Sequence, residues 1–303
     1  MSKSASSRSD NTVHTSPEEA SVVTGPRKLS AITGLENIHP QRFESIRKFR
    51  NDIRSRSDEL SRDDDESTSQ FLVFTNVSST DRAEMDVALE KMRIHTRMTY
   101  FMDENLLIVK FPTAKHEGAH GDLMDMIKWK IMPMGISKRE CKFVGATKYY
   151  GRRSSKEADS AFRPKSLRPD DADWPTIVLE SGLSESLPRL RLDAAWWLTE
   201  SQGQVKTVIV ISVKPATPII HVEKWELAPR PQPTARASST FNLPPPPDPT
   251  QIQQITLEPN TVTGAPLILE FEKLFLRLAV PPESDITFSA QELSDFAADI
   301  MRW

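Results

Sequence analysis

Three acidic residues of the sequence, Glu117, Asp159 and Glu180, could together hold a divalent metal ion. Asp159 precedes an expected extended segment, Glu180 closes the apolar run TIVLE, and Glu117 begins an expected helix. Carboxylates at strand ends, facing a helix carboxylate, would offer Mg²⁺ hard oxygen ligands and leave positions for a water whose pKa the ion lowers. The chemistry indicated is phosphodiester hydrolysis; the alternative for each residue is a solvated acid at the end of a strand.

Other familiar catalytic motifs are missing from the sequence. It has no Walker-type phosphate loop, no GxGxxG, no GxSxG and no kinase-type motif set. His116 and His120 could share a helix face as two zinc ligands would, but HEGAH offers no third ligand, so the alternative is a solvent-facing helix start. The single cysteine, Cys141, excludes an internal disulfide and fits a reducing compartment; we expect it half-buried in a strand.

The acids lie among segments that alternate between strand and helix patterns. Strands are predicted in FLVFT, NLLIVKFP, CKFVGATKYYGRR, TIVLE, VKTVIVISV and IIHVEKWEL. Helices are predicted in STDRAEMDVALEKM, HEGAHGDLMDMIKWKIMPMG and PRLRLDAAWWLTE. Because TIVLE, a helix and the fully apolar VKTVIVISV follow one another, we predict a βαβ crossover into a buried sheet, and hence an α/β fold.

The helix after Glu180 combines a core face with charged residues. Pro188 suits the first helical position, and Leu190, Ala194 and Trp197 share a face, so Trp197 is predicted to lie in the core. Stacking of Trp197 and its neighbour Trp196 on nucleic-acid bases is the alternative. On the other side of the helix, Arg189 and Asp193 are spaced to form an i, i+4 ion pair.

Composition divides the chain into a core and its flanks. Residues 1–69 are predicted to be a mostly disordered arm with a basic helix at 40–56, and residues 70–227 to be the core domain. Residues 228–263 are rich in proline and are predicted to be a linker. Residues 264–303 should form a strand and a helix that dock on the core. Ser289 and Glu292 form a capping box for that last helix.

Charge and hydropathy limit the classes of partner. The net charge of −3 gives no global attraction to phosphate, so a nucleic-acid contact needs a local basic surface. The segment 42–56 is basic, but the acidic run DELSRDDDES follows it, which favours a solvated arm. No apolar run is long enough to span a membrane and no secretory signal is visible, so we expect an intracellular protein of the cytoplasm or nucleus.

Several blocks resemble a fungal protein family without an assigned function. The blocks are FPTAKHEGAH, SSKEADSAFRP, WPTIVLESGLSESLPRLRLDAAWWL, VKTVIVISV and HVEKWEL, within residues 70–227, and LEFEKLFLR near the end. The core of that family resembles the PD-(D/E)XK, or restriction-endonuclease-like, fold. The resemblance implies a central mixed sheet with flanking helices and a Mg²⁺ site built from an Asp on one strand and an acid on the next.

Under this resemblance Asp159 is the motif Asp, Glu180 the motif acid and Glu117 an auxiliary metal ligand. The motif Lys, which would orient the attacking water, is replaced by Gly182. The resemblance offers Arg189 and Arg191 on the following helix as phosphate contacts, although arginine is a poor general base. Lys156 and Lys206 are the other candidates to replace the lysine, with solvated surface lysines as the alternative.

Two hypotheses about function follow. The first is a metal-dependent nuclease or phosphodiesterase of the PD-(D/E)XK type with a non-standard lysine. The second is a non-catalytic relative that keeps the fold as a module for binding nucleic acid or protein, favoured by Gly182 and by the acidic net charge.

Overall fold

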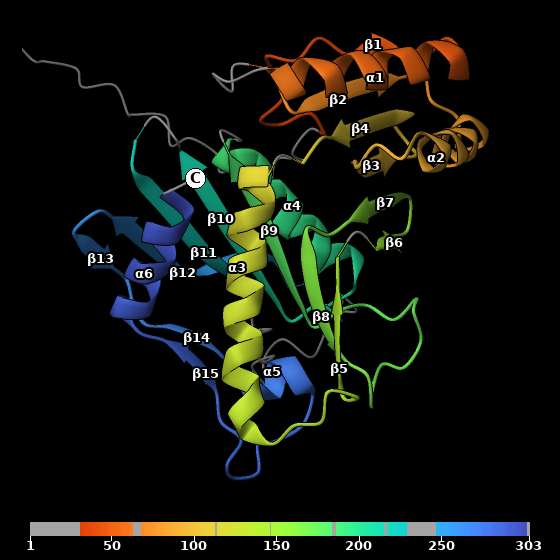
Figure 1. The fold of residues 1–303 in the computed structure, drawn as a ribbon. Coiled ribbons are helices and arrows are strands. Elements are labelled where there is room, and N and C mark those ends of the chain that lie inside the picture. Colours follow the sequence, from red (N-terminus) through yellow and green to blue (C-terminus); the bar gives the residue numbers. More distant parts are fainter. Residues whose placement is uncertain are drawn as a thin grey trace, which may run out of the picture. The chain divides into compact units, whose positions relative to one another are not determined.

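The computed structural model describes residues 31–62, 68–112, 114–145, 147–183, 186–214, 217–228 and 247–301. They form two large sheets and one two-stranded sheet with flanking helices (Figure 1). Both large sheets contain parallel and antiparallel strand pairs. The predicted α/β class, with a mixed sheet and flanking helices, is confirmed.

The larger sheet has seven strands and contains the predicted βαβ crossover. Its order is β13 (Thr261–Thr263), β12 (Pro249–Glu258), β11 (Ile219–Leu227), β10 (Thr207–Lys214), β9 (Ile177–Leu183), β8 (Ser160–Pro164) and β5 (Cys141–Val144). Strands β9 and β10 are parallel, and α4 (Leu187–Glu200) connects them. Every residue of β9 is buried, as expected for a strand covered on both faces.

Helices cover both faces of this sheet. On one face α3 (Ala114–Ile131) packs through Leu123 and Ile127. The short 3₁₀ helix η1 (Met132–Met134) follows α3, and four C-terminal elements join the same apolar cluster: β14 (Leu267–Leu269), α5 (Phe271–Phe275), β15 (Ile286–Phe288) and α6 (Ala290–Met301). On the other face α4 packs through the fully buried Trp197, so the predicted core position of this side chain is confirmed.

The second large sheet has six strands, and two helices pack on it. Its order is β1 (Gln41–Arg42), β2 (Phe71–Thr75), β4 (Leu106–Lys110), β3 (Arg97–Phe101), β7 (Ser154–Glu157) and β6 (Lys148–Tyr150). The helices α1 (Ile46–Arg62) and α2 (Ser79–Met92) pack on it around Phe49 and Ile53. The apolar spacing that predicted a short basic helix therefore marks a helix docked on a sheet.

Several element boundaries differ from the predicted ones. Ordered structure is described from Ala31, well before residue 70, and the predicted helix 40–56 is α1, which begins at Ile46 and ends at Arg62. Within the predicted linker, 229–246 lies outside the described residues, whereas 249–258 forms β12 of the large sheet. The high proline content led to the prediction of a linker here, although Ile255 and Leu257 lie at alternate positions and are buried in the core, as strand residues are. The capping box of α6 is present: the Ser289 amide donates to Glu292 at 2.8 Å.

Candidate functional site

The pairing of β8 with β9 brings Asp159 and Glu180 to neighbouring positions. Ser160 is the register partner of Leu179 in this antiparallel pair, so Asp159, one residue earlier, lies beside Glu180. Glu180 lies within β9 and does not close it, because the extended backbone continues through Ser181 to Leu183. Asp159 and Glu180 are only 2% and 1% exposed, so each carboxylate depends on partners from the protein.

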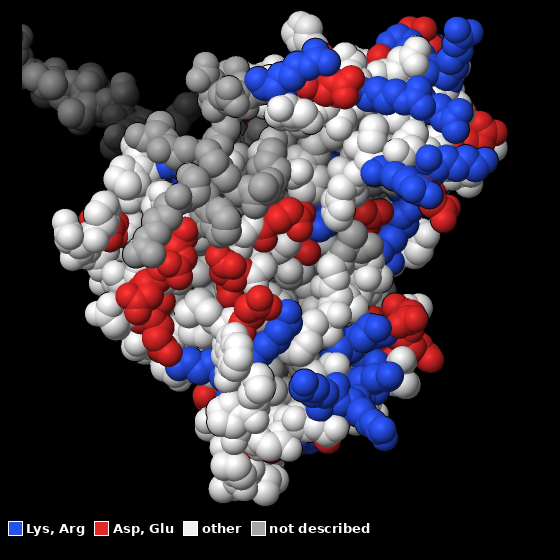
Figure 2. Space-filling model, in the orientation of Figure 1, with Lys and Arg blue, Asp and Glu red and all other residues white. Residues whose placement is uncertain are grey.

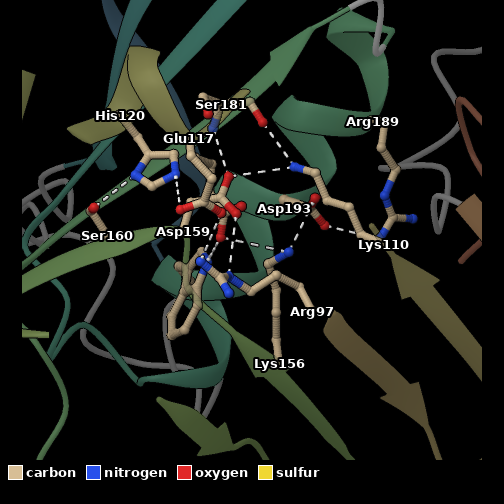
Figure 3. A network of polar contacts seen from close by, with 12 residues as sticks. Arg97, Lys110, Glu117, His120, Lys156, Asp159, Ser160, Ser181, Arg189 and Asp193 are labelled. Atoms are coloured by element: carbon tan, nitrogen blue, oxygen red, sulfur yellow. Dashed lines mark hydrogen bonds and ion pairs between the residues drawn. The ribbon is translucent and has the colours of Figure 1, made fainter. Parts of the chain in front are cut away.

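Asp159 receives its partners from three strands. Its Oδ2 accepts the Ser181 amide of β9 at 2.9 Å and lies 3.4 Å from the Lys110 ammonium of β4. Its Oδ1 lies 3.8 Å from Nε of Arg97, which belongs to β3. Lys110 also donates to the Ser181 carbonyl at 2.8 Å. Two basic side chains of the six-stranded sheet, Arg97 and Lys110, thus contact Asp159 at the start of β8 (Figure 3).

Arg97 links Glu117 to Asp159. The Arg97 guanidinium lies 3.2 Å from Oε1 of Glu117, at the first turn of α3. The other oxygen of Glu117 lies 3.4 Å from Nε2 of His120, and Nδ1 of His120 lies 2.8 Å from the Ser160 hydroxyl. The Glu117 side chain is 39% exposed and marks the solvent side of the cluster.

Glu180 is held by an indole and a lysine. Trp197 Nε1 donates to its Oε1 at 2.5 Å, and the Lys156 ammonium of β7 lies 3.6 Å from the same oxygen. Burial raises the pKa of Glu180 to about 8, because desolvation and the nearby Asp159 and Asp193 outweigh the attraction of Lys156. Glu180 is therefore largely protonated at neutral pH in this arrangement.

Asp193 extends the cluster along α4. Lys156 lies 3.1 Å from one of its oxygens and Arg189 3.0 Å from the other, so the predicted Arg189–Asp193 pair is present. Burial raises the pKa of Asp193, but Arg189 and Lys156 outweigh this effect and lower it overall. Arg189 also donates to the Ala31 carbonyl at 2.6 Å, which ties the start of the described chain to α4.

Acids and bases therefore alternate in two ion-paired groups that meet where Asp159 lies beside Glu180, and together we call them the acid cluster (Figure 3). Its acids are Glu117, Asp159, Glu180 and Asp193, and its bases are Arg97, Lys110, Lys156 and Arg189. A cavity among these side chains has about 10 Å³ of free volume, about enough for one water molecule. Within the described parts of the chain, no three His, Cys, Asp or Glu side chains are grouped as a metal site.

Several predicted site residues lie apart from the acid cluster. Arg191 pairs with Glu223 of β11 at 2.6 Å, so it is not part of the acid cluster, and its role as a phosphate contact stays a prediction. Lys206 donates to the Gly203 carbonyl at 2.7 Å and is not in the cluster. The His116 side chain lies outside the described atoms, whereas His120 contacts Ser160 and Glu117.

Arg97 and Lys110 are the cluster residues that sequence reasoning missed. Both belong to strands that pack against apolar side chains, and both are nearly buried, at 5% and 8% exposure. The available signal was Lys110 itself, a charge at the end of the apolar run LLIVK. A buried charge requires a counter-ion, so a lysine in such a strand indicates a carboxylate facing it.

No family model and no curated protein matches the sequence. Among solved structures, the chain is similar to a candidate nuclease belonging to DUF820 from Anabaena variabilis ATCC 29413. The two share 11% identity with a TM-score of 0.37, and the similarity covers 68% of this chain and 92% of that chain. No helix within the described ranges is long and apolar enough to cross a membrane.

Proposed function

We propose that the acid cluster is a metal-dependent phosphodiesterase site of the PD-(D/E)XK type, which acts on nucleic acid and is held closed in the described conformation. The observation that carries this proposal is the lysine beside Glu180. Lys156 lies 3.6 Å from the motif acid, so it can supply the ammonium group that Gly182 lacks. Asp159 directly before β8, Glu180 on β9 and Lys156 on β7 then form the acid, acid and lysine set.

Lys156 has two functions in this proposal. Its ammonium would orient the attacking water and stabilise the charge that develops on phosphate. Its second contact, with the ionised Asp193 at 3.1 Å, keeps the side chain in place in a buried setting. Arg189 is fixed by Asp193 and by the Ala31 carbonyl, which supports a positioning role for it.

The donor set of the cluster fits Mg²⁺. Asp159 and Glu180 offer hard carboxylate oxygens, and Mg²⁺ is usually held by one or two carboxylates together with waters and substrate phosphate oxygens. When bound, the ion would lower the pKa of a water and neutralise phosphate charge. Arg97 lies between Glu117 and Asp159, so the part of Glu117 as an auxiliary ligand stays a proposal that requires Arg97 to move.

Arg97 and Lys110 keep this site closed. They place two positive charges beside Asp159, where a divalent cation would be repelled at such short distances. The cavity has room for about one water molecule, so a phosphate group cannot enter either. We therefore propose that activity requires β3 and β4 to withdraw these two side chains from the acids.

The second candidate function is a non-catalytic binding module on the same fold. The observation that favours it is that cations of this chain pair every carboxylate of the acid cluster, which would serve a structural junction equally well. Under this hypothesis the ion pairs link the two sheets permanently, and metal ions neither bind nor stabilise the protein.

A basic surface for a nucleic-acid partner is available on α1. Arg47, Arg50 and Arg54 are spaced along one flank of the helix, and none of them has an ion pair with a described residue. Figure 2 shows Lys and Arg side chains gathered over the region of α1 and α2. Such a row suits the phosphate backbone and offers no base-specific contact, which is typical of binding that depends on salt and not on sequence.

The proposed role of Lys156 predicts a specific loss of nuclease activity. Supercoiled plasmid incubated with the protein and Mn²⁺ should be nicked, and Lys156→Met should slow nicking by about 10²-fold or more, because a stabiliser of transition-state charge is removed. Lys206→Met, a lysine outside the cluster, should leave the rate unchanged. Equal rates for Lys156→Met and wild type would assign the cleavage to another group or to a contaminant.

A further inference from the structure

The seven-stranded sheet ends in an open edge at β5. Of the described strands, only β8 pairs with it. The Lys165 amide donates to the Glu140 carbonyl at 2.7 Å, which fixes the alternation of the ladder: Lys142 and Arg163 exchange bonds, while the N–H and C=O of Phe143 point away from β8. An edge of this kind can pair with a further strand.

An apolar groove runs beside this edge, between β5 and the end of α3. It has a volume of about 450 Å³ and is lined by Asp125, Lys128, Trp129, Ile131, Met132, Ile136, Lys138, Cys141 and Phe143. Trp129 is 69% and Met132 56% exposed, which is unusual for side chains of this size side by side. Cys141 and Phe143 belong to the edge strand itself, so a strand added to β5 would direct alternate side chains into the groove.

Basic residues surround the edge strand. Lys138, Arg139 and Lys165 are exposed and Lys142 is half-buried, and none of the four has an ion pair with a described residue. Figure 2 shows a group of Lys and Arg side chains in the region of β5. The Lys128 ammonium lies 5.1 Å from the centre of the Phe143 ring and pairs with Asp125, so it is part of the groove wall.

From this arrangement we infer that β5 and its groove form a docking site for an extended acidic segment of a partner protein. The segment adds a strand to the sheet, places apolar side chains at alternate positions in the groove, and pairs its Asp or Glu side chains with the basic rim. A second copy of this chain does not fit, because edge-to-edge pairing would bring two basic rims against each other. This inference does not depend on the proposed nuclease function.

The test uses the full-length protein and a fluorescent nine-residue peptide in which Asp or Glu alternates with Leu, Phe or Val. We expect saturable binding by anisotropy, weaker at high salt, and a loss of at least tenfold in affinity for Trp129→Ala/Met132→Ala and for Lys138→Glu/Lys142→Glu. The matched control is Leu278→Ala/Val280→Ala, which removes two other exposed apolar side chains (73% and 64% exposed) and should bind as wild type.

Two further peptides test the mode of docking. A version with Lys in place of Asp and Glu, and a version with N-methylated amides, should both bind at least tenfold more weakly, because they lack the charge pairing and the strand hydrogen bonds. Absence of binding by the acidic peptide would overturn the inference. Equal binding by either altered peptide would also overturn it. So would a dimer of this chain, observed by sedimentation, that Trp129→Ala dissociates and Lys138→Glu/Lys142→Glu leaves intact.

Discussion

Replacing Arg97 with Gln and Lys110 with Met should lower the free energy of unfolding by about 3–5 kcal/mol in metal-free buffer, and Mn²⁺ should restore a large part of this loss. Removing Arg97 and Lys110 takes two ion-pair partners from the buried Asp159, and losing the partner of a buried charge has a cost of this size. A divalent ion bound at the vacated position would return positive charge to the site. At 100 times its dissociation constant, an ion stabilises the folded state by about 2.7 kcal/mol.

The measurement is urea unfolding of wild type and the double variant, each with EDTA and with millimolar Mn²⁺. Arg82→Gln is the control, because it removes another nearly buried arginine from an ion pair, that with the partly exposed Asp86, without touching Asp159. Asp86 keeps a second partner, Lys148. Mn²⁺ should stabilise the double variant much more than the other two proteins; if all three proteins respond equally, the ion binds elsewhere and the closed-site proposal fails.

Replacing Glu180 with Gln should stabilise the protein increasingly as the pH rises from 5 to 8.5. Burial, together with Asp159 and Asp193, raises the pKa of Glu180 to about 8 from its ordinary 4.5 against the attraction of Lys156 and Lys110. The folded state therefore keeps a proton that the unfolded state releases between these two values. The contribution of Glu180 to stability is fully present below pH 4.5 and falls by up to about 1.4 kcal/mol per pH unit until pH 8.

Glutamine keeps the shape and an acceptor for Trp197 but cannot ionise, so it removes this dependence. Unfolding free energies at pH 5, 6, 7 and 8.5 should show a difference from wild type that grows to a few kcal/mol in favour of Glu180→Gln. Glu283→Gln provides a control of the opposite kind, because Arg277 lowers the pKa of Glu283 to about 2 and its effect should stay constant over this range. A constant difference for Glu180→Gln as well would show that Glu180 ionises normally.

The same titration links stability to metal binding. Carboxylates bind a metal ion in their deprotonated form, so an ion that binds Glu180 must displace its proton. The affinity for Mn²⁺ and the nicking rate should therefore both increase as the pH rises toward 8. This pH dependence distinguishes Glu180 from an exposed acid, whose pKa lies far below that range.

The parts of the fold that local patterns specify could be predicted from the sequence. TIVLE, the Pro188 helix and VKTVIVISV follow one another with clear strand and helix periodicity, and β9, α4 and β10 form as expected. The neighbourhood of Asp159 and Glu180 follows from the pairing of the two strands that carry them. By contrast, the sequence did not predict that Glu180 lies within its strand. The residues SGL that follow it lack a strand-like apolar pattern, although they continue the ladder with β10.

The counter-ions of the cluster could not be predicted, because they come from distant parts of the chain. Lys110 is 49 residues from Asp159 and 71 from Ser181, and it belongs to a different sheet. No local spacing encodes such a pairing. Arg191 follows Arg189 by two residues and so lies on nearly the opposite side of the helix, where it pairs with Glu223 of β11. Local spacing does not predict this partner either.

The central claim is that Arg97 and Lys110 close a functional phosphodiesterase site. The most direct measurement is nicking of supercoiled plasmid, with Mn²⁺ at pH 8, by the Arg97→Gln/Lys110→Met protein beside the same protein that also carries Asp159→Asn. Opening the site should raise the rate above that of wild type, and Asp159→Asn should abolish the gain. Two results would contradict the account: a folded, Mn²⁺-stabilised double variant that does not cleave the plasmid, or one that cleaves it at the same rate with and without Asp159→Asn. Either result would favour the binding-module function.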